Sequence, residues 1–164
     1  MALADDASAV ASVLLESFVE YKSSYTNEGF NATTPTSDQL RNRMTEGPVW
    51  VALHNGAIVG TASAVSQGEA LYIRGMAVLP AARGHKVGEL LLKAVESYAM
   101  AHGCKSLILS TTPFLSRAIR LYEQFGFRRS GVGPHNLFGT PLFTMVKNLS
   151  RPELKERDRE RLVE

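Results

Sequence analysis

The stretch Val78-Leu-Pro-Ala-Ala-Arg-Gly-His-Lys-Val-Gly-Glu-Leu-Leu-Leu92 decides the fold predicted for this chain. An apolar, strand-like run ends at Pro80, a short basic turn follows, and an amphipathic helix begins directly after the turn. Such a turn presents several backbone N–H groups together at the positive end of a helix dipole. Gly84 and Gly88 permit close backbone approach there. The stretch therefore predicts a site for a phosphate-bearing ligand.

The elements around this stretch predict a mixed α/β sheet with helices on its faces. Helical spacing of apolar residues predicts helices over 5–21, 36–44, 86–102 and 116–125. Short apolar runs predict strands over 49–53, 57–65, 71–79, 106–110, 127–131 and 142–149, with Gly75 marking a bulge or a close backbone approach. Residues 22–36 and 132–140 are expected to be loops. Hairpin turns predict antiparallel pairing of the first three strands, and the strand–helix–strand unit over 71–110 predicts a parallel pair.

Composition and charge limit the classes of function. A chain of 164 residues predicts one domain over 1–149, and the mixed-charge segment 150–164 is expected to be a solvated tail, helical or frayed. The net charge of +2, from 18 basic and 16 acidic residues, is too balanced to predict nucleic-acid binding. A single cysteine, Cys104, excludes an internal disulfide and a cysteine-based metal cluster.

The sequence also carries no membrane or export signal that can be recognised. No apolar run approaches the ~20 residues of a membrane span. Asp5 and Asp6 stand where a signal peptide has its basic region. The expectation is a cytoplasmic protein without a metal, a membrane partner or a nucleic-acid partner.

Two segments carry a resemblance to a known family. The run Met76-Ala-Val-Leu-Pro-Ala-Ala-Arg-Gly-His-Lys-Val-Gly88, followed by Leu90-Leu-Leu92, is similar to an acetyl-CoA motif written Arg/Gln-x-x-Gly-x-Gly/Ala. The run Ala118-Ile-Arg-Leu-Tyr-Glu-Gln-Phe-Gly-Phe127 is similar to Ala-x-x-x-Tyr-x-x-x-Gly-Phe. Both occur in the GNAT superfamily of acetyl-CoA-dependent N-acetyltransferases, which the chain resembles over 50–149. The resemblance implies a mostly antiparallel sheet with a central, splayed parallel strand pair, and acetyl transfer from acetyl-CoA to a primary amine by direct attack in a ternary complex.

Three positions depart from the family pattern. Lys86 occupies the place of the usual first glycine, so the turn must accommodate a side chain there. Leu115 stands where many members have Asn, which removes one contact to the pantetheine arm. The first strand of the family has little room before Asp5, so we expect it to be shortened or absent.

The resemblance also implies roles for individual residues. Backbone N–H groups of the turn would bind the CoA pyrophosphate, the N–H of Val78 would stabilise the oxyanion, and Tyr122 would protonate the departing CoA thiolate as general acid. The residues expected to contact CoA are Met76, Ala77, Val78, Arg83, Gly84, His85, Lys86, Val87, Gly88, Glu89 and Ala118.

The base and the acceptor stay open at this level. Candidates for the base are Glu69, Glu28 or a water chain. The acceptor is expected over segments 21–30 and 132–140, where aromatic side chains either contact it or cap the core, and Glu20 or Glu28 could attract a cationic amine. These aromatic residues are Tyr21, Tyr25, Phe30 and Phe138. The sequence identifies no acceptor and does not decide whether the chain forms a homodimer. A non-catalytic acyl-CoA-binding or sensing domain is the main alternative, and an interaction module that uses the charged tail is a third reading.

Overall fold

The computed structural model describes residues 1–149, so the expected charged tail lies outside the described residues. Its α-helices are α1 (Ala7–Phe18), α2 (Asn27–Thr33), α3 (Ser37–Glu46), α4 (Val87–Ala101) and α5 (Ser116–Phe125). Short 3₁₀ helices are η1 (Ala4–Asp6), η2 (Val19–Ser24) and η3 (Pro80–Ala82). The strands are β1 (Val49–His54), β2 (Ala57–Gln67), β3 (Ala70–Val78), β4 (Ser106–Thr111), β5 (Arg128–Ser130), β6 (Asn136–Leu137), β7 (Thr140–Pro141) and β8 (Phe143–Asn148).

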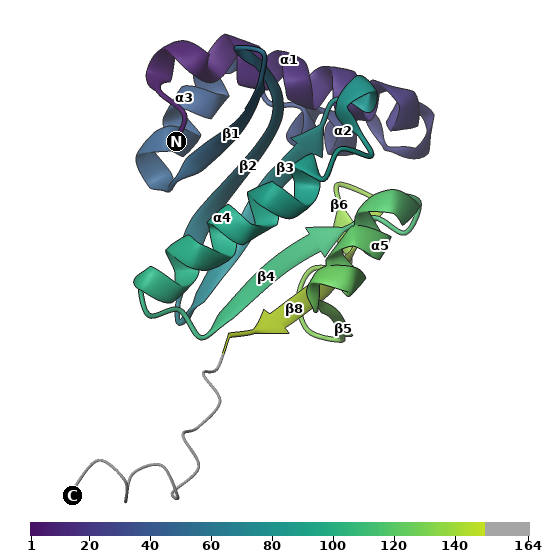
Figure 1. Cartoon of the computed structure of the whole chain (residues 1–164). Helices are drawn as coiled ribbons and strands as arrows, with labels where there is room; N and C mark the ends of the chain where they lie inside the picture. Colours follow the sequence, from purple (N-terminus) through teal and green to yellow (C-terminus); the bar gives the residue numbers. More distant parts are fainter. Residues whose placement is uncertain (150–164) are drawn as a thin grey trace, which may run out of the picture.

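Six of the strands form one sheet in the order β1-β2-β3-β4-β8-β5 (Figure 1). The β3–β4 pair is parallel, and the other neighbours are antiparallel. The parallel pair is joined through α4, as a crossover connection requires. This arrangement confirms the mixed sheet that the sequence predicts.

Helices cover both faces of the sheet. Helix α4 runs diagonally across one face, with α5 beside it, while α1 and α3 lie on the opposite side (Figure 1). The α4 face carries the larger core, because Leu91, Leu92 and Val95 recur at helical spacing and bury against β-strand side chains such as Leu71 and Leu107. A second core joins α1 and α3 to the other face, through buried residues Val10, Val13, Leu14, Leu40 and Ala77.

The segment expected to be a loop before α3 is helical instead. It forms η2 and then α2, whose N-cap is Thr26, with the Thr26 hydroxyl accepting a 3.0 Å hydrogen bond from the N–H of Gly29. The sequence prediction was wrong here because α2 has only seven residues and too few apolar positions to show a period. Phe30 is its main buried anchor.

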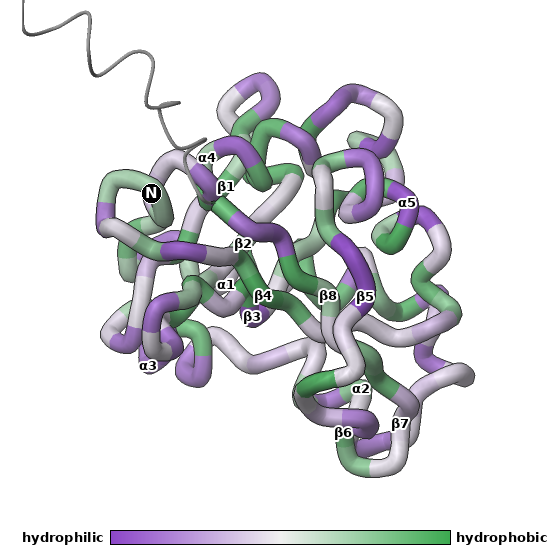
Figure 2. Tube along the Cα trace, turned by 90° about the horizontal axis from the view of Figure 1, so that it is seen from below, coloured by the Kyte–Doolittle hydropathy of each residue, from purple (hydrophilic) through white to green (hydrophobic). Residues whose placement is uncertain are grey.

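The second expected loop, 132–140, contains part of a small hairpin, β6–β7, which packs beside α2 (Figure 2). The N–H of Thr26 donates to Oγ1 of Thr140 at 2.9 Å, and the Thr26 hydroxyl donates to the carbonyl of Phe138. These contacts, which we call the Thr26–Thr140 clasp, join segments 114 residues apart. The clasp therefore holds together the two segments that the sequence predicted as separate loops.

The N-terminal residues contact the edge of the sheet. The N–H of Ala2 donates a 2.8 Å hydrogen bond to the carbonyl of Val49 in β1, and η1 follows at Ala4.

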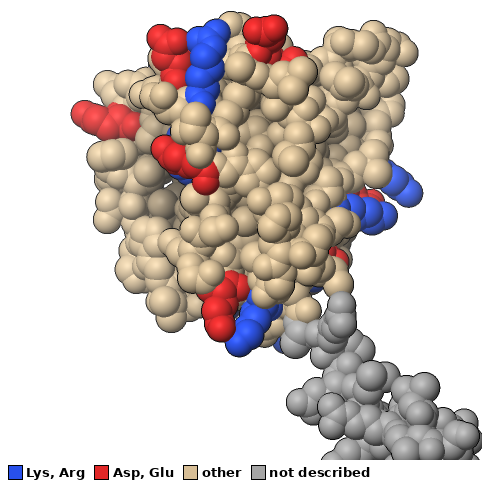
Figure 3. Space-filling view, turned by 90° about the vertical axis from the view of Figure 1, so that its left-hand side faces the viewer, with Lys and Arg blue, Asp and Glu red and all other residues tan. Residues whose placement is uncertain are grey.

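Two surface features bear on the expectations about partners. Over residues 1–149, none of the helices is both long and apolar enough to cross a bilayer. On the face shown in Figure 3, acidic and basic side chains lie interspersed around a broad uncharged area.

Candidate active site

The parallel strands β3 and β4 separate at a defined point. Their pairing runs from Ala70 opposite Ser106 to Ile73 opposite Leu109, and the ladder ends there although both strands continue. The separation coincides with a β-bulge: Ser63 of β2 pairs with Gly75 and the next residue, Ala64, pairs with Ile73, which leaves Arg74 without a partner. The bulge that the glycine suggested is therefore present, and it lies where the two strands part.

Beyond the bulge, β3 turns free backbone groups toward the gap. The N–H of Leu79 donates to the carbonyl of Val59, which marks that pair as hydrogen-bonded in the β2–β3 ladder. Alternation in an antiparallel ladder then makes Val78–Gly60 and Met76–Ala62 non-hydrogen-bonded pairs. The N–H and C=O groups of Met76 and Val78 consequently point away from β2 and toward the side from which β4 has departed.

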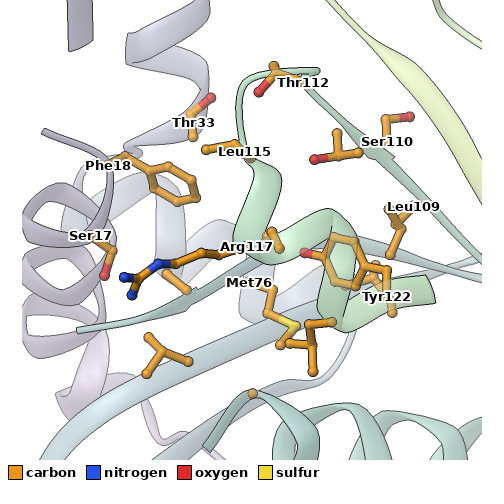
Figure 4. A pocket seen from close by; sticks show the side chains of 18 of the residues that line it. Ser17, Phe18, Thr33, Met76, Leu109, Ser110, Thr112, Leu115, Arg117 and Tyr122 are labelled. Carbon is orange, nitrogen blue, oxygen red and sulfur yellow. The ribbon is translucent and has the colours of Figure 1, made fainter. Parts of the chain in front are cut away.

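This gap opens into a cavity of about 790 Å³. It is walled by β3, β4, the α4 entrance, α5, and the α1–α2 side. All the residues expected to contact CoA line the cavity, except His85. Tyr122 lines the cavity as well. In Figure 4, side chains from α1, β3, β4 and α5 converge on this space, and the phenol oxygen of Tyr122 points into it.

The turn before α4 has the form that anion binding needs. Gly84 and Lys86 both have positive φ, +84° and +61°, and α4 begins at Val87. Lys86, at the family's glycine position, is thus in the left-handed region, where a side chain costs roughly 1–2 kcal/mol.

Gly88 lies close to neighbouring side chains, which the sequence did not show. A Cβ at this position would lie 2.7 Å from Cδ2 of Leu121 and 3.4 Å from Cε of Met76. The first turn of α4 therefore sits directly against α5 and β3. Close approach at Gly88 is to protein side chains, in addition to any approach by a ligand.

Arg83 is held by neighbouring groups. Its Nη1 lies 2.6 Å from Oε1 of Glu20, and its Nη2 donates to the carbonyl of Ser17 at 3.2 Å. The side chain thus connects the turn to the end of α1 and to η2. Glu20, one of the two carboxylates suggested to attract a cationic amine, is occupied by this ion pair.

Tyr122 is buried in the inner face of α5. It packs edge-on against Phe127, and Gly126, with φ +105°, ends the helix so that the chain can turn back into the sheet. Desolvation, with a smaller contribution from Tyr25, raises the pKa of Tyr122 to about 12. The phenol is therefore protonated at neutral pH.

The carboxylates suggested as a base do not line the cavity. Glu69 lies at the opposite end of β3, where it pairs with Lys105 at 2.9 Å, and Glu28 is exposed on α2. Among the lining residues the one carboxylate is Glu89, and it pairs with Lys93 at 3.2 Å along α4. The geometry excludes Glu69 as a direct base and leaves Glu28 turned to the surface.

The aromatic residues expected near an acceptor divide into two groups. Tyr21 and Tyr25 line the cavity, and Tyr25 packs edge-on against Phe114 at a centroid distance of 4.9 Å. Burial raises the pKa of Tyr25, and the neighbouring hydroxyls of Thr112 and Thr33 offset part of that rise. Phe30 is core, and Phe138 is exposed with φ +48°, so neither lines the cavity.

Three arginines of the cavity wall were not predicted. Arg43 comes from α3, Arg74 is the bulge residue of β3, and Arg117 belongs to the first turn of α5. Leu115, at the family's Asn position, precedes α5 and also lines the cavity. The bulge next to Gly75 was the one signal in the sequence for Arg74, and Arg43 had none because the cap residues predict its helix without indicating which side chains face a site.

Comparison with known proteins agrees with this geometry. The family described as "Acetyltransferase (GNAT) family" matches residues 14–127. An uncharacterised N-acetyltransferase, YjgM, of Escherichia coli K12 is 30% identical over 128 residues, which cover 74% of this chain and 76% of that protein. N-acetylaspartate synthetase of Mus musculus is 33% identical over 102 residues, 61% of this chain. The chain spans about a third of that relative, since the match covers 34% of it.

Solved structures share the fold at low sequence identity. The PaiA N-acetyltransferase of Thermoplasma acidophilum, in complex with coenzyme A, has a TM-score of 0.77 and 16% identity, with 90% of this chain and 95% of that chain covered. The ribosomal-protein-S18-alanine N-acetyltransferase of Escherichia coli has a TM-score of 0.73 and 16% identity, with 94% of each chain covered. With the splayed β3–β4 pair, the glycine turn before α4 and a family match over most of the chain, this protein belongs to the GNAT acetyltransferase family.

Proposed function

We propose that this protein transfers an acetyl group from acetyl-CoA to a primary amine by direct attack in a ternary complex. One observation carries the proposal. Behind the β3 bulge, the backbone groups of Met76 and Val78 face a cavity of about 790 Å³ that Tyr122 also lines. A thioester carbonyl placed there would meet a backbone donor on one side and a phenol on the other.

The turn before α4 is the proposed seat of the CoA pyrophosphate. Its amides from Arg83 to Gly88 stand at the start of a 15-residue helix, whose dipole favours a negative charge there by about 0.3–1 kcal/mol when exposed. The Lys86 side chain adds a positive charge, while the Arg83 guanidinium is engaged by Glu20. The PaiA N-acetyltransferase, which shares the fold, is in complex with coenzyme A, and this supports CoA as the ligand.

The pantetheine arm would then continue along β3. The free N–H and C=O groups of Met76 and Val78 offer it the hydrogen bonds that β4 no longer makes. The acetyl carbonyl would accept from the N–H of Val78, which becomes more favourable as negative charge develops on that oxygen.

The reaction forms one C–N bond and breaks one C–S bond. The amine lone pair attacks the thioester carbon, the tetrahedral oxyanion collapses, and CoA leaves as a thiolate. Tyr122 donates its phenol proton to that sulfur, and it regains a proton from the newly formed ammonium through water. Burial keeps the pKa of Tyr122 at about 12, so the donor is present at neutral pH.

Water is the proposed route by which the amine loses its proton. Neither Glu69 nor Glu28 lines the cavity, and Glu89 is paired along its own helix. A free alkyl amine with a pKa near 10.4 is mostly protonated at pH 7. We therefore expect the rate to rise with pH as the neutral amine becomes more abundant.

A non-catalytic acyl-CoA-binding domain is the second candidate, and the same scarcity of carboxylates at the splay favours it. Titration calorimetry with CoA, together with CoA release from acetyl-CoA over a panel of amines, separates the two. CoA binding with amine-dependent release supports acetyl transfer. CoA binding without release for any amine supports the binding domain, and a folded protein that binds no CoA contradicts both.

A further inference from the structure

Two arginines meet beside the point where β3 and β4 separate. Arg43 projects from α3, and Arg74 is the unpaired residue of the β3 bulge. Both line the main cavity, and both also line an adjoining hollow of about 260 Å³. A bulge commonly redirects a side chain next to a functional site, and here it directs a guanidinium toward this junction.

The charges at this junction do not balance among the described residues. Nη1 of Arg74 pairs with Oε2 of Glu46, whereas its Nε and Nη2 atoms are buried and have no hydrogen-bond partner within residues 1–149. Arg43 makes a long hydrogen bond of 3.4 Å from Nη2 to the carbonyl of Ala32. The other polar side chains of the hollow are neutral, namely Asn31, Gln39 and Asn42. Two guanidinium groups thus face one carboxylate.

The environment shows the cost of this imbalance. Burial, and then the nearby charge of Arg74, lower the pKa of Arg43, and Glu46 opposes part of that change. A guanidinium remains charged even so. Buried guanidinium N–H groups are normally hydrogen-bonded, so the two buried Arg74 nitrogens could donate to an anion bound beside Arg43.

An anion bound between Arg43 and Arg74 would lie next to the reacting atoms. Nη1 of Arg43 is 3.7 Å from the position that a Cβ on Gly75 would occupy. Gly75 directly precedes Met76, whose backbone faces the gap proposed for the acetyl arm. A negative group bound between the two arginines would therefore lie close to the gap proposed for the acetyl arm.

We propose that the acceptor is a small α-amino acid whose carboxylate is bound by Arg43 and Arg74 while its amine attacks the thioester. This inference rests on the proposed acetyl transfer. A carboxylate accepts the paired N–H groups of guanidinium in a fork geometry, which a neutral amide cannot match. An α-amino acid separates carboxylate and amine by one carbon, which suits the short distance between the arginine pair and the splay.

Paired substrates test the proposal. Each of the common α-amino acids is compared with its own α-carboxamide, which keeps the amine and the side chain but removes the negative charge. We expect kcat/KM for the best acid to exceed that of its carboxamide by about 100-fold, since a lost charge-assisted hydrogen-bond pair leaves buried donors unpaired. Equal or better turnover of the carboxamides overturns the proposal.

Variants connect that preference to Arg43. Arg43→Gln should lower kcat/KM for the acid by about 30- to 100-fold and leave the carboxamide and the KM for acetyl-CoA unchanged. Arg43→Lys should recover only part of the loss, because lysine keeps the charge and lacks the fork. Arg41→Gln is the matched control: Arg41 is on the same helix, is exposed, and pairs with Asp38 at 2.7 Å. An equal loss in Arg41→Gln, or none in Arg43→Gln, contradicts the assignment.

A binding measurement separates this inference from the acetyl transfer on which it rests. If no amine is acetylated, the acetyl transfer proposal fails, and calorimetry of amino acids with the CoA-saturated protein still decides the arginine site. Binding that is present in the original protein and lost in Arg43→Gln supports it. The absence of binding by every amino acid in the folded, CoA-saturated protein overturns it.

Discussion

The two ends of the cavity are built in different ways. The proposed CoA end consists of backbone: a turn with two positive-φ residues, the start of α4 and the free strand edge of β3. The proposed acceptor end consists of side chains from α1, α2, α3 and the bulge, with the β6–β7 hairpin clasped beside them. Backbone recognition is fixed by local sequence, whereas side-chain recognition depends on segments brought together by the fold. We therefore expect substrate preference to depend on the proposed acceptor end and CoA affinity on the proposed CoA end.

The largest expected effect comes from adding a side chain at Gly88, in the first turn of α4. Gly88→Val should raise the Kd for CoA about 100-fold, because the added side chain would crowd Leu121 and obstruct the turn proposed to hold the pyrophosphate, a loss of about 2.7 kcal/mol. Calorimetry with CoA measures the effect.

Gly131→Val is the control for Gly88→Val. A Cβ at Gly131 would meet nothing within 4 Å, so this variant should bind CoA normally. Circular dichroism shows whether Gly88→Val is folded. A folded Gly88→Val that retains its CoA affinity would remove the CoA end from this turn.

The next effect tests the chemistry and leaves both ends of the cavity in place. Tyr122→Phe should lower kcat by about 100-fold, the lower range for loss of a general acid, with unchanged CoA affinity. Tyr98→Phe is the control, because Tyr98 stacks on His102 away from the cavity. Loss of CoA affinity with retained kcat would instead make Tyr122 a packing residue.

The pH dependence sharpens the same assignment. The pKa of Tyr122 is raised from 10.0 to about 12, so the protonated donor persists through pH 10, where an ordinary tyrosine would be half ionised. Rates measured between pH 7 and 10 should rise with amine deprotonation and show no decline from this phenol. A decline near pH 10 that disappears in Tyr122→Phe would contradict the burial argument.

A smaller effect belongs to the acceptor end alone. Thr140→Val removes the acceptor of the Thr26 N–H and should lower the free energy of unfolding by about 1–3 kcal/mol. We expect a higher KM for the amine and an unchanged KM for acetyl-CoA. Thr45→Val, at the exposed end of α3, should leave both KM values unchanged. A rise in both KM values for Thr140→Val would mean that the two ends are not separable.

The smallest expected effect is a gain. Lys86→Gly should raise the free energy of unfolding by about 1 kcal/mol, because glycine adopts positive φ without the cost that lysine carries. Asn55→Gly, at φ +50°, should gain less, since Asn tolerates this region better. Chemical denaturation of both variants measures the difference. A loss of stability in Lys86→Gly would show that the Lys86 side chain contributes contacts that outweigh its strain.

The contrast between the two ends also explains what could be predicted from sequence. The turn 83–88, the α4 stripe and the parallel β3–β4 pair follow from local spacing, and the structure confirms them. The arginine pair does not, because Arg43 lies on a mostly polar helix and only the register of β2 against β3 reveals that Arg74 is a bulge residue. Helix α2 was not predicted for a different reason. It is stabilised by an N-cap and one buried aromatic ring, and neither produces a helical period of apolar residues in the sequence.

The Thr26–Thr140 clasp has a consequence for dynamics. It ties a seven-residue helix to a two-strand hairpin through a few hydrogen bonds, while the sheet nearby is held by continuous ladders and a large apolar core. Segments with so little buried apolar contact open at lower free energy than the rest of a domain. Amides of α2 and β6–β7 should therefore exchange with deuterium together, and ahead of the amides of β3 and β4. The proposed acceptor end of the cavity would then open locally while the strands at the proposed CoA end remain folded.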